Sequence, residues 1–151
     1  KSVLANAKIL SETLKNNGFK IYSGGTDTHL MLVDLRPFNV KGNLAAESLS
    51  RANITCNKNG IPFDSESPMI TSGIRLGSQA ATTRGFGLKE FEIVGKLITK
   101  VIDGLSKNPD DNSKVEDEVR KQVVALCSSF PIYKNLRKWF AQYAKKEKLQ
   151  L

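Results

Sequence analysis

Residues 29–35 read His-Leu-Met-Leu-Val-Asp-Leu, a stretch that is apolar on both faces in its middle. Side chains alternate between the two faces of a β-strand, so this pattern is typical of a central strand. Residues 19–23 form a shorter candidate strand, and the intervening residues 24–28, Gly-Gly-Thr-Asp-Thr, have the composition of a turn. We therefore expect the two strands to pair as a hairpin.

Apolar residues at helical spacing surround this hairpin on both sides in the sequence. They predict a helix over residues 3–17, a short helix over 42–52, a long amphipathic helix over 88–105 and a further helix after Ser113. In the short helix, the residues expected to face inward are Leu44, Leu49 and Ala52. Ser113 and Glu116 have the spacing of a capping box, in which the two residues satisfy amides at the helix start.

Two more short strands are expected, over residues 54–56 and 73–77, with irregular structure between them. The order is helix, two strands, helix, strands and then helices. This order predicts an α+β fold in which helices cover a small antiparallel sheet. No strand is followed by a glycine fingerprint that opens a helix, which argues against a dinucleotide-binding fold.

The chain has 151 residues and a formal net charge of +8, a length typical of one domain. Most of the excess charge lies in residues 134–151, which hold six basic residues and one acidic residue. We expect residues 1–133 to form one domain and residues 134–151 a basic C-terminal helical extension. The apolar side of that extension is expected to consist of Leu136, Trp139, Phe140 and Tyr143. Because the rest is nearly balanced in charge, nucleic-acid binding is not expected.

Two cysteines and one histidine limit the possible chemistry. Cys56 and Cys127 cannot form a disulfide framework, and together with His29 they fall one ligand short of a closed zinc site. We expect reduced thiols in a cytoplasmic protein, and no metal. No apolar run approaches the roughly 18 residues that a membrane-spanning helix needs, so no membrane association is expected.

Arg75 is the most informative single residue. Ile74 and Leu76 flank it, so on a strand they face one side and Arg75 faces the other. Gly73 and Gly77 leave room for a ligand or another backbone to approach. A guanidinium carries a rigid fork of donors that matches a carboxylate or a phosphate. The alternative is an arginine on an edge strand that pairs with a surface acid.

Two other stretches could bind ligands. Residues 57–62, Asn-Lys-Asn-Gly-Ile-Pro, form a polar loop whose amides could meet the edge of a heterocycle, or a solvated turn. Residues 78–86, which contain Thr82, Thr83, Arg84 and Gly85, could bind an anion where a helix begins, or simply form a capped helix start. No nucleophile–base pair, paired carboxylates or phosphate-cradling glycine loop emerges from the sequence.

Six short motifs occur in order at compatible spacing. They are residues 24–30 (GGTDTHL), 32–35 (LVDL), 51–55 (RANIT), 57–59 (NKN), 71–77 (TSGIRLG) and 83–86 (TRGF). Together they resemble the C-terminal small domain of serine hydroxymethyltransferase, also called glycine hydroxymethyltransferase. The resemblance extends from about Val3 through Tyr133.

This resemblance implies part of a fold-type-I transferase that depends on pyridoxal phosphate. Such enzymes act in one-carbon metabolism and amino-acid biosynthesis, and interconvert serine plus tetrahydrofolate and glycine plus 5,10-methylenetetrahydrofolate. In the family, the arginine of the Ser-Gly-Ile-Arg motif holds the substrate carboxylate, and that position is Arg75 here. The second asparagine of the Asn-Lys-Asn motif lines the folate pocket, and that position is Asn59 here. The complete enzyme is expected to be a homodimer or a higher oligomer.

The family's large domain is expected to lie outside this sequence. No lysine here stands in the threonine-rich motif that carries the Schiff base, so we expect no catalytic Schiff-base lysine in these residues. Pyridoxal phosphate would then be held mainly by the large domain, and this chain alone should be inactive. Two other classes stay open, a non-catalytic amino-acid-binding domain and a basic module that binds nucleic acid or a partner.

Overall fold

The structure is a computed structural model that describes residues 1–132. The expected basic extension, residues 134–151, lies outside the described residues. The helices are α1 (Ser2–Asn16), α2 (Gly42–Arg51), α3 (Gln79–Arg84), α4 (Leu88–Lys107) and α5 (Ser113–Ser128). The strands are β1 (Lys20–Ile21), β2 (Leu30–Asp34), β3 (Asn57–Asn59) and β4 (Gly73–Gly77). Two short 3₁₀ turns complete the set, η1 (Tyr22–Gly24) and η2 (Arg36–Phe38).

The four strands form one sheet in the order β1-β2-β4-β3, and every neighbouring pair is antiparallel. β1 and β2 pair as the predicted hairpin, with Lys20 opposite Asp34. β4 lies between β2 and β3, so Arg75 stands opposite Leu32 on one side and opposite Asn57 on the other. Arg75 is therefore on an interior strand, and the edge-strand alternative for this residue is wrong.

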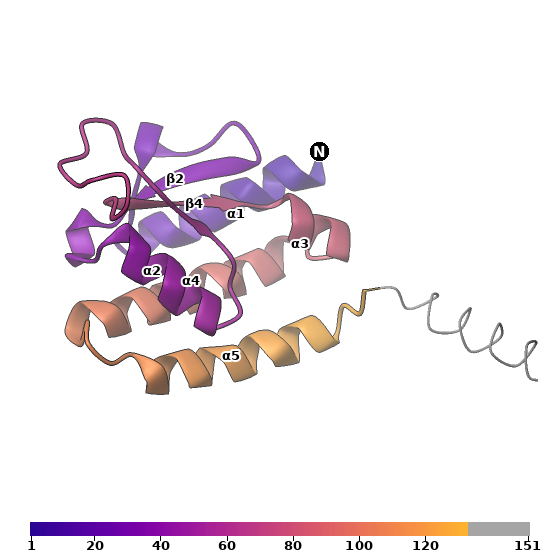
Figure 1. The fold of residues 1–151 in the computed structure, drawn as a ribbon. Coiled ribbons are helices and arrows are strands. Elements are labelled where there is room, and N and C mark those ends of the chain that lie inside the picture. Colours follow the sequence, from indigo (N-terminus) through magenta and orange to yellow (C-terminus); the bar gives the residue numbers. More distant parts are fainter. Residues whose placement is uncertain (133–151) are drawn as a thin grey trace, which may run out of the picture.

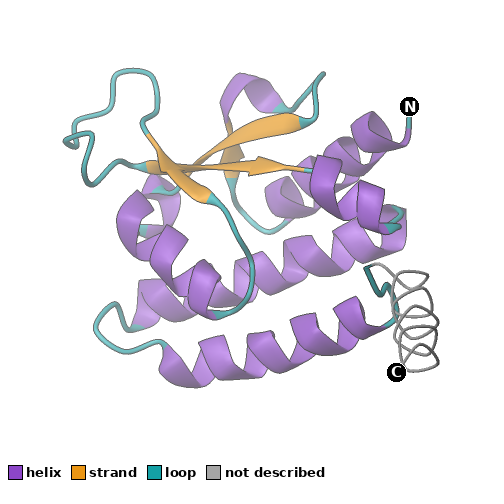
Figure 2. Cartoon of the chain, turned by 45° about the vertical axis from the view of Figure 1, so that its right-hand side comes forward, coloured by secondary structure: helices purple, strands orange, loops and turns teal. Residues whose placement is uncertain are grey.

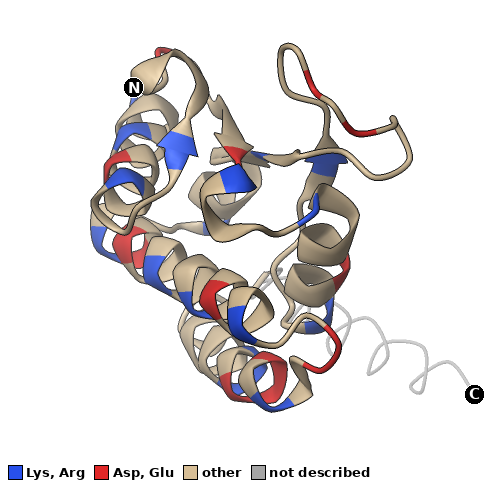
Figure 3. Ribbon diagram, turned by 90° about the vertical axis from the view of Figure 1, so that its left-hand side faces the viewer, with Lys and Arg blue, Asp and Glu red and all other residues tan. Residues whose placement is uncertain are grey.

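The helices gather on one side of the sheet, and α5 forms a further layer beyond α4 (Figures 1 and 2). Side chains that alternate along β2 and β4 supply the sheet's part of the core, namely Met31, Val33, Ile74 and Leu76. The long predicted stripe is confirmed in α4, where Phe91, Ile98 and Ile102 are almost fully buried. The small α+β fold with an antiparallel sheet is thus as expected. Basic and acidic residues alternate along the outer sides of the helices (Figure 3).

The strand predicted over residues 54–56 is wrong, because these residues form the connection between the end of α2 and β3. Asn53 has a positive φ of 64°, and the amide of Ile54 donates to the carbonyl of Leu49 at 2.8 Å. Such a left-handed residue with a backward hydrogen bond is a common helix ending. The strand therefore starts only at Asn57. In α2 itself, Leu49 and Ala52 are buried as predicted, but Leu44 is exposed and Ala45 takes the inward position.

The capping box predicted for Ser113 and Glu116 is also wrong. The residue before α5 is Asn112, whose side-chain amide donates to the carbonyl of Val101 and to Ser48 Oγ, both at 3.0 Å. The Glu116 carboxylate points to α2, where it accepts hydrogen bonds from Ser48 Oγ at 2.6 Å and from Arg51 Nε at 2.7 Å. A tertiary contact has replaced the local one, and it ties α5 to α2.

This buried carboxylate predicts a pH dependence of stability. The hydrogen bonds from Arg51 lower the pKa of Glu116 below its usual value, against the effect of burial and with help from Ser48. A lowered folded-state pKa stabilises the fold above the unfolded pKa of about 4.3, and this stabilisation is lost as the pH falls further. Glu116→Gln should cost about 1–2 kcal/mol in the free energy of unfolding at pH 7. Urea titrations should show this difference shrink below about pH 4, whereas a pH-independent difference would contradict it.

The described residues bear on three expectations from the sequence: no membrane-spanning helix, no metal site and no disulfide. No helix among residues 1–132 is long and apolar enough to cross a membrane. Within the same residues, no group of three metal-ligating side chains comes together. Cys56 and Cys127 are both free thiols, and burial raises the pKa of Cys56 to about 11.

Candidate functional site

Arg75 projects from the face of the sheet that is turned away from the helices. Ile74 and Leu76 are buried, whereas Arg75 is exposed, as the alternation predicted. Its Nε donates to the side-chain oxygen of Asn57 at 3.2 Å, across the β3–β4 pair. Within residues 1–132 the guanidinium makes no ion pair, so its terminal nitrogens are available to an anion. The alternative in which Arg75 pairs with a surface acid is not seen in the described part of the chain.

Asn59 lies on the same face as Arg75. Asn57 and Asn59 are two residues apart on β3, so their side chains share one side of the sheet. Asn59 stands opposite Gly73, and its side-chain nitrogen donates to the carbonyl of Gly60 at 2.8 Å. Its side-chain oxygen accepts no hydrogen bond within residues 1–132, so it can accept one from a ligand. The structure thus brings the two predicted site residues together, and places Asn59 on a strand rather than in the predicted loop.

Gly73 is required by close packing on this face. A Cβ at this position would lie 2.7 Å from Ile61 Cγ2, 2.8 Å from the carbonyl oxygen of Val33 and 3.0 Å from that of Asn59. The predicted close approach is therefore real, but the space above Gly73 is filled by Ile61. Gly77 is also closely packed, because a Cβ there would lie 2.6 Å from Gln79 Oε1 and 3.1 Å from Leu30 Cδ2.

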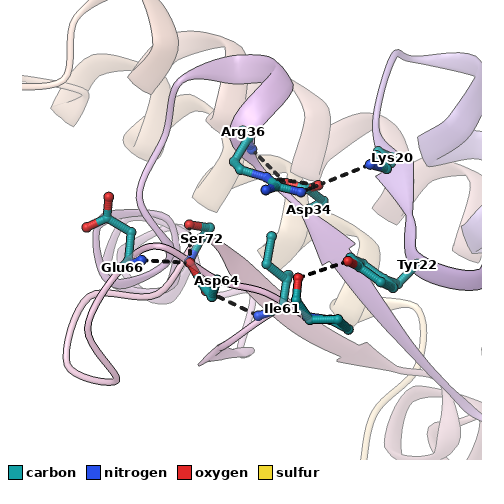
Figure 4. A network of polar contacts seen from close by, with 9 residues as sticks. Lys20, Tyr22, Asp34, Arg36, Ile61, Asp64, Glu66 and Ser72 are labelled. Carbon is teal, nitrogen blue, oxygen red and sulfur yellow. Dashed lines mark hydrogen bonds and ion pairs between the residues drawn. The ribbon is translucent and has the colours of Figure 1, made fainter.

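The loop after β3 is held by Asp64 (Figure 4). The carboxylate accepts hydrogen bonds from the amides of Ile61, Glu66 and Ser72 at 3.1, 3.0 and 2.9 Å, and from Ser72 Oγ at 2.6 Å. Burial alone would raise the pKa of Asp64, but these hydrogen bonds outweigh it and hold the pKa well below its usual range. The loop is therefore fixed by an ionised carboxylate at neutral pH. Sequence reasoning missed this role.

The same loop crosses the open face of the sheet. It leaves β3 at one edge, and the carbonyl of Pro62 accepts a hydrogen bond at 3.0 Å from the hydroxyl of Tyr22, which follows β1 at the opposite edge (Figure 4). A cavity of about 720 Å³ lies beside this crossing. Its lining includes Tyr22, Leu30, Leu32 and Pro62, together with polar residues of α1 and of the 23–28 turn.

Two carboxylates near this face, those of Asp34 and Asp64, already have hydrogen-bond partners within the domain. Asp34 is almost fully buried and accepts from Arg36 Nη2 at 2.7 Å, and Lys20 Nζ lies 3.7 Å away (Figure 4). Burial would raise the pKa of Asp34, but the hydrogen bonds from Arg36 and the charge of Lys20 lower it. Asp34 and Asp64 thus hold the fold together and are not free to bind a ligand.

Residues 82–85 are the end of α3, with Gly85 as its C-cap, and their polar side chains do not form the predicted anion site. Thr82 Oγ1 donates to the carbonyl of Ser78 and accepts from the amide of Asn6. Arg84 donates to the carbonyls of Cys127 and Phe130, at 3.0 and 2.8 Å, and so holds the end of α5. These contacts are structural. The predicted aromatic stripe of Trp139, Phe140 and Tyr143 lies outside the described residues.

The family model described as "Serine hydroxymethyltransferase" matches residues 1–98. The chain belongs to the serine hydroxymethyltransferase family. It is 85% identical over 137 residues to the serine hydroxymethyltransferase of Pelagibacter ubique, which covers 91% of this chain and 31% of that protein. It is 62% identical over 133 residues to serine hydroxymethyltransferase 3 of Colwellia psychrerythraea, and 60% over 134 residues to the Marinomonas enzyme of the same family. These alignments cover 88% and 89% of this chain, and 31% and 32% of the relatives.

The chain spans about a third of the length of these serine hydroxymethyltransferases. The family uses pyridoxal phosphate and tetrahydrofolate. The described residues on the open face do not by themselves fit pyridoxal phosphate. Lys58 stands opposite Ile74, on the other side of β3 from Asn57, and donates to the carbonyl of Met69. Asp34 and Asp64 are each held by hydrogen bonds from other residues of the domain, so neither carboxylate is available to the cofactor.

Proposed function

We propose that this chain is the C-terminal part of a fold-type-I serine hydroxymethyltransferase, with residues 1–133 as its small domain and residues 134–151 as a basic extension. The complete enzyme would interconvert serine plus tetrahydrofolate and glycine plus 5,10-methylenetetrahydrofolate. This part contributes one wall of the active site. The remaining walls and the binding of pyridoxal phosphate come from the two thirds of the relatives' length that this chain does not cover.

One observation carries this proposal: Arg75 lies on the open face of an interior strand, and its guanidinium fork makes no ion pair within residues 1–132. β2 and β3 hold the strand from both sides, and Asn57 orients Nε. A fork fixed in this way can bind a carboxylate through two parallel hydrogen bonds, which sets the orientation as well as the affinity of an amino acid. Arg75 is thus suited to hold the carboxylate of serine or glycine.

Asn59 is suited to bind the second substrate, the folate. It lies on the same face as Arg75, and its side-chain carbonyl oxygen, which has no partner within residues 1–132, can accept a hydrogen bond from an N–H group. Folates carry N–H groups and acceptor nitrogens along one edge of a flat heterocycle. We assign Asn59 to that edge, beside the amino acid that Arg75 holds.

The experiment compares two reactions of the full-length enzyme. Asn59→Ala should weaken folate-dependent cleavage of serine by about 3- to 10-fold in kcat/KM, because a neutral hydrogen bond is worth about 0.5–1.5 kcal/mol. Cleavage of hydroxy-amino acids that need no folate should keep its wild-type rate. Asn16→Ala, at an exposed position near the end of α1, serves as the matched control. Equal loss in both reactions would mean that Asn59 supports the fold or the cofactor instead.

A further inference from the structure

The residue that stands out in the loop over this face is Phe63. Its side chain is 100% exposed, and its backbone has a positive φ of 58°. The amide of Asp64 donates to the carbonyl of Ile61 at 3.0 Å, so residues 61–64 form a β-turn. With proline at the second position and a positive φ at the third, the turn is type II. Glycine or asparagine is the residue that this third position favours, and here it is a phenylalanine.

Neither local folding nor packing accounts for this phenylalanine. A bulky residue in the left-handed region is strained, and a fully exposed aromatic ring gains nothing from burial. The turn nevertheless holds Phe63 firmly from both sides. Tyr22 fixes Pro62, and four hydrogen bonds fix Asp64. A strained, exposed ring on a rigid turn is the arrangement expected of a preorganised contact with a ligand or partner.

The position of the turn indicates what the ring meets. Ile61 lies directly over Gly73, on the face that carries Arg75 and Asn59. The contact between Pro62 and Tyr22 carries the chain over that same face toward β1. Phe63 therefore belongs to a turn that stands above the proposed site, four residues after Asn59.

We propose that Phe63 is the apolar platform against which the flat ring system of the folate packs, while Asn59 binds the edge of the heterocycle. This inference rests on the proposed function, because it assumes that the folate binds on this face. An amide that recognises a ring's edge leaves the ring's two flat surfaces to be covered. Aromatic side chains cover such surfaces well, because they lose little conformational freedom and stack on any π-face.

The test uses three substitutions at position 63 in the full-length enzyme. Phe63→Asn suits the turn but removes the ring, Phe63→Leu keeps an apolar side chain without the ring, and Phe63→Tyr keeps the ring. Binding of tetrahydrofolate is measured by anaerobic calorimetry, beside its KM in serine cleavage. We expect Phe63→Asn to weaken binding about 5- to 150-fold, the range for loss of one stacking contact. Phe63→Leu should be intermediate, and Phe63→Tyr close to wild type.

Two further readouts separate this role from a structural one. Phe63→Asn should keep or raise the melting temperature, because asparagine tolerates the left-handed backbone. Folate-independent cleavage of hydroxy-amino acids should be unchanged. If Phe63 instead packs against the rest of the protein, Phe63→Asn will melt earlier and its affinity for tetrahydrofolate will match wild type, which overturns the inference. A wild-type enzyme that binds no tetrahydrofolate would overturn the proposed function itself.

Discussion

Arg75→Lys is expected to lower kcat/KM for serine at least ~100-fold in the full-length enzyme. Lysine keeps the positive charge but has no planar fork, so the two parallel hydrogen bonds to the substrate carboxylate cannot both form. A hydrogen bond to a charged group is worth about 1.5–3 kcal/mol, and the lost orientation adds to the lost affinity. The measurement is steady-state kinetics with serine and tetrahydrofolate.

The fold should tolerate this substitution, because Arg75 is exposed and makes one side-chain hydrogen bond, to Asn57, among the described residues. The melting temperature should therefore stay close to wild type. Arg120→Lys, on the exposed side of α5, is the matched control and should leave both kinetics and stability unchanged. A variant at position 75 with nearly normal kinetics and a lowered melting temperature would show that Arg75 is a structural residue.

Gly73→Ala is expected to destabilise the domain by about 3 kcal/mol, which corresponds to a fall of about 10 °C in melting temperature. The added methyl would overlap two backbone carbonyl oxygens, those of Val33 and Asn59, as well as Ile61 Cγ2. A side chain can rotate away, but the two carbonyls belong to the neighbouring strands and cannot move without disturbing the sheet. Thermal unfolding of the 151-residue chain, followed by circular dichroism, measures the effect.

Gly25→Ala is the matched control for this experiment. A Cβ at position 25 would meet no heavy atom within 4 Å. Its φ of 171° is extended backbone that any residue can adopt. This variant should melt within about 2 °C of wild type, since surface substitutions usually change stability by less than 0.5 kcal/mol. If Gly73→Ala also melts like wild type, the close contact over β4 is not rigid.

Much of the candidate site could be predicted from local patterns. The alternation Ile74-Arg75-Leu76 predicted that Arg75 faces away from the core, and the structure confirms this exposure. The stripe of α4 was predicted from its spacing alone. Such predictions succeed because a period of two or of 3.6 residues decides which side chains share a face, whatever the rest of the chain does. The short motifs around these positions likewise identified the family, which the comparison with known proteins confirms.

Other features depended on segments that are far apart in the sequence. Glu116 had the spacing of a capping residue, but Ser48 and Arg51 on α2 offered it better partners. Residues 57–59 have the composition of a loop, yet pairing with β4 makes them a strand. Phe63 lies in the segment for which the sequence predicts only irregular structure, because nothing local shows that its turn is fixed to Tyr22.

The sequence by itself therefore determined the faces of the helices and strands, the family, and which arginine and asparagine to examine. The tertiary structure decided that Arg75 lies on an interior strand without an acidic partner among residues 1–132, and that Asn59 shares its face. It also decided that a strained turn stands over that face. The physical reason is that side-chain periodicity is a property of neighbouring residues, whereas strand order, ion pairing and loop anchoring depend on which distant groups the folded chain brings within hydrogen-bonding distance.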